Sequence, residues 1–64
     1  MAQREILFEF QRVGTMVKVT AVDPQAMESV STLGPASAGQ EALRRLAVQK
    51  LDYVLARKAK ANRR

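Results

Sequence analysis

The stretch from Ser37 to Lys58, SAGQEALRRLAVQKLDYVLARK, is the longest periodic segment of the chain and most limits how the chain can fold. At about 100° per residue, one helical stripe is apolar and consists of Leu43, Ala47, Leu51 and Val54. Further apolar side chains flank this stripe, with Leu46 and Tyr53 on one side and Val48 and Leu55 on the other. The segment therefore predicts one long helix with more apolar surface than a single small sheet can cover.

The residues before this segment predict where the helix begins. Pro35 disfavours helical backbone at the preceding position. Ser37 can accept from the first free amides, and Gln40 follows three residues later, which is the spacing of a capping box. We therefore expect Ser37 to cap the helix.

Two alternating runs surround Gly14. In residues 4–13 the side chains Ile6, Phe8 and Phe10 share one face, and residues 15–23 continue the alternation. Aromatic and branched residues with a period of two are typical of half-buried strands, so the runs predict a hairpin. If the rings are buried, Phe8→Ala or Phe10→Ala should cost about 3–5 kcal/mol.

The register of this hairpin has two solutions. A two-residue loop, Gly14-Thr15, would place Phe10 beside Val19 and Phe8 beside Ala21. A four-residue loop, residues 12–15, would instead pair Phe8 with Val19. Both registers keep the same face inward, so the sequence leaves the choice open.

A third strand is expected at about residues 27–33, after a turn at Asp23-Pro24. It is rich in serine and threonine, and such a polar strand suits a sheet edge. The predicted fold is α+β: a three-stranded antiparallel sheet followed by one long C-terminal helix (β-β-β-α). The helix should cover the sheet face formed by Ile6, Phe8, Phe10, Val17, Val19, Ala21 and Val30. We expect residues 1–64 to form one domain, with an ordered core at about 4–58 and a flexible basic tail at 59–64.

A chain of 64 residues is marginally stable alone. It has no cysteine or histidine, so disulfides and a structural zinc site are not expected. Self-association is the remaining route, and we expect a homodimer. The short connection Gly34-Pro35-Ala36 favours exchange of the helix between chains; exchange of the first strand about Gly14 is the alternative. The candidate interface consists of Leu43, Leu46, Leu51, Tyr53 and Val54, with Leu46 and Tyr53 nearest the partner.

No catalytic arrangement is visible, and we expect a protein that is not an enzyme and needs no cofactor. Without histidine, neither general acid–base catalysis nor activation of a serine has an evident base. Residues 34–39 resemble a phosphate-binding loop in their two glycines, but Gln40-Glu41 stands where Lys-Ser/Thr would complete the motif. We interpret this segment as a strand-to-helix turn.

The net charge of +5 permits contact with nucleic acid. A basic C-terminal end could bind phosphates without reading sequence, through Arg57, Lys58, Lys60, Arg63 and Arg64. The function hypotheses are therefore a non-catalytic homodimeric interaction or scaffold module and, alternatively, a nonspecific nucleic-acid-binding protein. No membrane span and no signal peptide are evident, so the expected location is the cytoplasm.

Several short motifs together resemble a known family. They are LFEF followed by RVG, then Asp23-Pro24, then GPA before Ser37, and finally KLDYV around Tyr53. This combination resembles a family of very short, uncharacterised proteins found mainly in alphaproteobacteria, and the likeness extends from about residue 7 to residue 57. The resemblance implies a bacterial source. It implies no catalytic or binding residue, because the family has no assigned activity.

Overall fold

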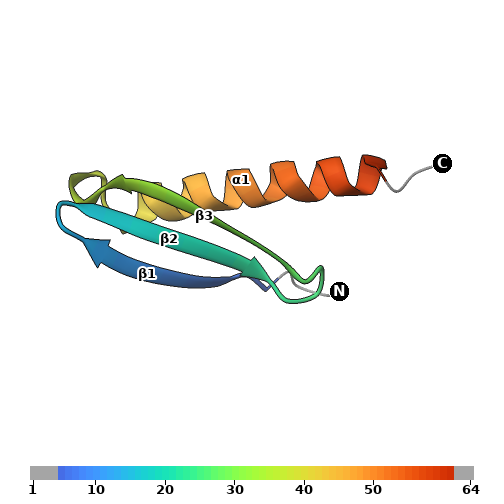
Figure 1. Cartoon of the computed structure of the whole chain (residues 1–64), viewed down its shortest axis with the longest axis horizontal. Coiled ribbons are helices and arrows are strands. Elements are labelled where there is room, and N and C mark those ends of the chain that lie inside the picture. Colours follow the sequence, from blue (N-terminus) through green and yellow to red (C-terminus); the bar gives the residue numbers. More distant parts are fainter. Residues whose placement is uncertain (1–4, 62–64) are drawn as a thin grey trace.

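The fold is a single antiparallel sheet with one helix on one face, as predicted (Figure 1). It is seen in a computed structural model that describes residues 5–61. The elements in chain order are β1 (Leu7–Val13), β2 (Met16–Asp23), β3 (Glu28–Pro35), the 3-10 turn η1 (Ala36–Ala38) and α1 (Gln40–Ala61). The strand order is β1-β2-β3, so the polar third strand lies at an edge, as its composition indicated.

The β1–β2 hairpin has the shorter of the two possible loops. Phe10 is paired with Val19, and the pairing continues to Val13 and Met16, which leaves two loop residues. Gly14, the first of them, has a φ of +62°. A type II′ turn requires positive φ at this position, which glycine adopts without steric cost.

The β2–β3 turn is closed by a side chain. Asp23 Oδ1 accepts hydrogen bonds from the backbone N–H groups of Gln25 and Ala26, at 3.1 and 3.2 Å. Met27 then adopts a φ of 55° and is 87% exposed. The third strand begins one residue later than predicted because Met27 belongs to the turn, and the strand continues to Pro35.

The predicted helix start at Ser37 is wrong. Ser37 lies inside η1, and α1 begins at Gln40. Gly39, with a φ of 89°, joins the two, and its carbonyl accepts from the N–H of Leu43 at 3.2 Å. Gly39 is therefore the N-cap residue of α1, in place of Ser37, which the sequence predicted. At its other end, α1 continues to Ala61, beyond the predicted end at Lys58.

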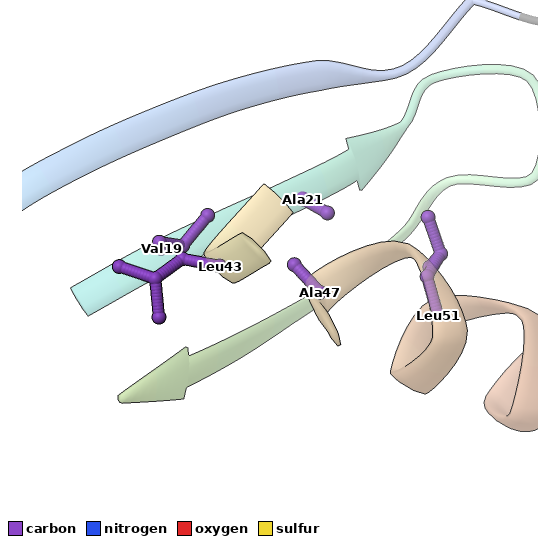
Figure 2. Packing of buried hydrophobic residues seen from close by; sticks show 5 residues of the cluster. All are labelled: Val19, Ala21, Leu43, Ala47 and Leu51. Atoms are coloured by element: carbon purple, nitrogen blue, oxygen red, sulfur yellow. The ribbon is translucent and has the colours of Figure 1, made fainter. Parts of the chain in front are cut away.

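The core lies between β2 and α1. Its fully buried residues are Val19 and Ala21 from β2 and Leu43, Ala47 and Leu51 from α1 (Figure 2). The residues predicted to line the inner sheet face surround this core and are partly buried: Ile6, Phe8, Phe10, Val17 and Val30. The apolar stripe of the helix and the alternating face of the sheet thus meet as predicted.

The helix is not centred on the sheet. It packs mainly on β3 and β2 and leaves β1 at the open side (Figure 1). This offset explains why Phe8 and Phe10 remain half-buried although they point to the helix side. No helix in the described part of the chain is long and apolar enough to cross a membrane.

Candidate functional site

The residues predicted to line a dimer interface occupy two different environments. Leu43 and Leu51 lie in the chain's own core, and Val54 is half-buried. Leu46 and Tyr53, by contrast, are 50% and 62% exposed. Only the exposed side chains are available to a second molecule while the helix stays on its own sheet.

Two contacts show which side of α1 faces which strand. Lys50 Nζ donates to the backbone O of Ser31 in β3 at 2.8 Å. The Arg44 guanidinium lies 5.5 Å from the ring centroid of Phe8 in β1. Residues three or four positions apart lie on the same side of a helix. The side with Lys50 therefore carries Leu46 and Tyr53 toward β3, and the side with Arg44 carries Val48 toward β1.

The free side of β1, which we name the β1 edge, consists of the outward backbone of Phe8, Phe10 and Arg12. Ala36 N donates to Thr15 O at 2.8 Å, so these two residues form a hydrogen-bonded pair. Hydrogen-bonded and non-hydrogen-bonded pairs alternate along antiparallel strands, and this pair therefore shows which residues of β2 bond to β3 and which bond to β1. With the observed registers, even-numbered residues of β2 bond to odd-numbered residues of β1. The peptide groups of the three even-numbered residues therefore point away from the sheet, and no strand in the described part of the chain lies beside them.

Apolar side chains accompany this free backbone. The rings of Phe8 and Phe10 lie with centroids 6.5 Å apart and are only half-buried. Val48, also half-buried, lies on the side of α1 from which Arg44 reaches the Phe8 ring. The β1 edge thus combines unpaired hydrogen-bonding groups with partly exposed aromatic surface.

The opposite edge, on β3, is obstructed at two positions. The outward carbonyl of Ser31 accepts from Lys50, and Pro35 has no N–H to donate. Charged side chains and proline are common means of preventing edge-to-edge pairing of sheets. The two edges of this sheet are therefore not equivalent.

The outer sheet face, away from α1, has apolar residues at its two ends. Leu7, Val13 and Leu33 are exposed there. The register places a polar row between them, made of Glu9, Thr20 and Ser31. The apolar surface on this face is therefore divided by polar side chains.

The basic C-terminal end is only partly free. Lys58 forms an ion pair with Glu28, and the Arg57 guanidinium lies 5.8 Å from the Tyr53 ring centroid. Lys60 is exposed in the last turn of α1, whereas Arg63 and Arg64 lie outside the described residues. The structure therefore brings together an exposed aromatic ring and an exposed guanidinium, which the sequence did not predict.

Catalytic and metal-binding arrangements were not expected. Across residues 5–61, no group of three or more Asp, Glu, His or Cys side chains is placed to hold a metal ion. The segment that resembles a phosphate loop forms η1 and the turn into α1, with Gly39 N donating to Ala36 O at 3.2 Å.

Residues 3–58 match the family model described as a domain of unknown function, DUF6898. The chain belongs to the DUF6898 family. No curated protein and no solved structure matches it. The resemblance to an uncharacterised family is thereby confirmed.

Several residues that carry the DUF6898 resemblance have local structural roles. Gly14 supplies the positive φ of the hairpin loop, and Asp23 closes the second turn. Gly34 lies directly beneath Leu43 of the helix. Phe8 and Phe10 differ from these, because their surroundings in the single chain leave their rings partly uncovered.

Proposed function

We propose that this DUF6898 protein is a small non-catalytic module that acts as a homodimer through its exposed apolar surface. The observation that supports this proposal most is the imbalance between core and surface. Among residues 5–61, five hydrophobic side chains are fully buried, and two of them are alanines. Large apolar side chains meanwhile remain exposed on the sheet and on the helix, including Leu7, Val13, Leu33, Leu46 and Tyr53.

The size of the chain makes this imbalance consequential. A domain of 64 residues buries about 60% of the surface that its unfolded chain exposes. Its sequence has no cysteine or histidine for a disulfide or a zinc site. Burial of apolar surface between two copies would contribute about 25 cal/mol for each Å² removed from water. Dimerisation is thus the stabilising route best matched to this surface.

We propose a side-by-side dimer in place of the exchange of helices suggested by the sequence. Exchange was expected because the connection into the helix looked short and strained. Pro35 has a φ of −70° and a ψ of 142°, which is relaxed extended backbone. Ala36 continues the ladder by donating to Thr15. With no strain to relieve at this connection, each helix can stay on its own sheet.

Sedimentation equilibrium and thermal denaturation over about 1 to 100 µM protein test the proposal. The stability of an associating protein rises with its concentration. We expect a reversible monomer–dimer equilibrium and a melting temperature that rises with concentration. A monomer throughout this range, with a constant melting temperature, would contradict the proposal.

A second candidate function is nonspecific nucleic-acid binding. The exposure of Tyr53 beside Arg57 favours it, because an aromatic ring with a neighbouring cation can stack on a base. Lys60 adds an exposed charge near the same end of α1. Such a surface would bind single strands through stacking and phosphate contacts.

Fluorescence anisotropy with single-stranded and duplex oligonucleotides at about 50 mM salt tests this candidate, since phosphate contacts are strongest at low salt. Arg57→Gln with Lys60→Gln should weaken binding. The matched control is Lys18→Gln, which removes an exposed cation from the sheet. Equal loss in both variants would show that only net charge matters, and absence of binding by the wild type would eliminate the function.

We also propose the cytoplasm of a bacterium as the setting of this module. The family resemblance supports a bacterial source, and the lack of cysteine is compatible with a reducing compartment. Cell fractionation with an antibody against the chain tests the location.

A further inference from the structure

We infer that two copies of the chain join through antiparallel pairing of their β1 edges, with the two-fold axis at Phe10, to form one continuous sheet. This inference rests on the proposed homodimer and specifies its interface. The occupant of the β1 edge is thus a second copy of the same strand.

The ladder geometry permits this pairing without rearrangement. Phe8, Phe10 and Arg12 already direct their peptide N–H and C=O groups outward. In an antiparallel pair, directly opposed residues of this kind exchange two hydrogen bonds. Phe10 would bond to the partner's Phe10, and Phe8 would bond to the partner's Arg12.

The sequence of β1 selects this register. The strand has seven residues, Leu7 to Val13, and Phe10 is the middle one. Centring on Phe10 therefore pairs the whole strand with its copy. It also places Glu9 opposite the partner's Gln11, whereas centring on Glu9 would oppose two carboxylates directly. Like charges in directly opposed positions destabilise a sheet.

The same register buries the apolar surface that the single chain leaves open. On the outer face, exposed Leu7 would lie opposite the partner's exposed Val13. On the helix side, the half-buried Phe10 rings of the two copies would meet at the axis. Arg12 is compatible with this position because its Nε donates to Gly14 O at 2.6 Å. The guanidinium is thus held toward the loop. The aliphatic part of the Arg12 side chain can then lie beside the partner's Phe8 ring.

The choice of β1 over β3 follows from the difference between the edges. Lys50 occupies the outward carbonyl of Ser31, and Pro35 lacks an N–H. β1 contains no lysine and no proline. Within residues 5–61, no side chain of α1 forms a hydrogen bond with the outward peptide groups of β1. A second strand would therefore meet an occupied carbonyl and a missing N–H at β3, whereas the outward groups of Phe8, Phe10 and Arg12 at β1 offer a continuous set.

Amide hydrogen exchange of the unmodified protein, followed by NMR at low and high concentration, tests the interface. The amides of Phe8, Phe10 and Arg12 should exchange about tenfold or more slowly once the dimer forms, because opening them then requires dissociation. The amides of Ser29 and Leu33 on the β3 edge serve as internal controls and should not slow. If sedimentation shows a dimer while the three β1 amides remain fast, the inference is wrong and the proposed function stands. If no dimer forms, both fail.

Disulfide trapping tests the register independently, because the chain contains no cysteine of its own. Glu9 and Gln11 are exposed, so Glu9→Cys and Gln11→Cys should leave the fold intact. When the two variants are mixed and oxidised, the mixed disulfide should dominate over both symmetric ones. Dominance of the symmetric Glu9→Cys product would indicate a register centred on Glu9. Equally efficient trapping between Gln11→Cys and a Ser29→Cys control would show that β1 is not the interface. Either result would overturn the inference.

Discussion

A methyl group added at Gly34 would lie 2.4 Å from Cδ2 of Leu43, so the Leu43 side chain fills the space beside this glycine. Leu43 is almost fully buried and has little room to move away. Gly34→Ala should therefore destabilise the chain by about 1–3 kcal/mol, which is typical of overpacked cores. Urea denaturation measures this change, with Ser29→Ala at an exposed position of the same strand as the control.

A double variant separates the clash from any other effect of alanine in β3. Shortening Leu43 to alanine removes the atom that Gly34→Ala would strike. The double variant should lose less free energy of unfolding than the sum of the two single variants, because contacting residues are not additive. Strict additivity would show that the cost of Gly34→Ala has another origin.

Leu51→Ala should cost more stability than Phe8→Ala when both are measured at concentrations where the chain is monomeric. Leu51 is fully buried, and its truncation should cost about 2–5 kcal/mol. The 3–5 kcal/mol that the sequence predicts for the phenylalanines assumes full burial, whereas Phe8 is half-buried, so we now expect about 2 kcal/mol. Chemical denaturation at low micromolar protein gives the order. The reverse order would show that Phe8 is more deeply packed than Leu51 and would contradict this description of the core.

Asp23→Ala should destabilise the β2–β3 turn by about 1–2 kcal/mol, since a net hydrogen bond contributes about 1 kcal/mol. Asp23 is only 7% exposed and accepts from two backbone amides. Asp23→Asn keeps an oxygen at this position and should lose less than half as much. Thermal denaturation of the two variants compares them. An equal loss would point to the charge of Asp23 and away from its acceptor role.

Met27→Gly should stabilise the chain by up to about 1 kcal/mol, because left-handed backbone is unfavourable for residues with a side chain. Met27 has a φ of 55° and is almost fully exposed, so its side chain contributes little packing. Met27→Ala is the control, since it shortens the side chain but keeps the backbone strain. A gain in melting temperature for alanine equal to that for glycine would exclude a backbone origin.

The strands and the face that each buries were readable from the sequence because period two fixes side-chain direction regardless of pairing. The hairpin register was not, since both solutions place Phe8 and Phe10 on the same face. The register depends on the length of the loop at Gly14. The positive φ of Gly14 belongs to the two-residue loop, and the alternation of side chains does not reveal this φ. The third strand begins one residue later than predicted because Asp23 accepts from two amides of the turn and Met27 has left-handed backbone.

The helix and its flanks were predictable to a similar degree. The stripe of Leu43 and Leu51 followed from periodicity, but Ser37 was misassigned because a 3-10 turn intervenes before α1. Which flank faces which strand depends on the sideways position of the helix on the sheet. Contacts between distant residues set that position, such as Lys50 with Ser31, and a repeat of 3.6 residues carries no information about them. The unequal edges of the sheet were hidden for the same reason.

The contact between Lys50 and Ser31 also limits the stoichiometry of assembly. A sheet with two open edges can add molecules without end and grow into a fibre. Here the ammonium group bonds to an outward carbonyl of β3 within the same chain and disfavours strand addition there, so the proposed addition takes place at β1. An assembly built at β1 is complete at two chains, and raising the protein concentration adds more dimers without lengthening the sheet.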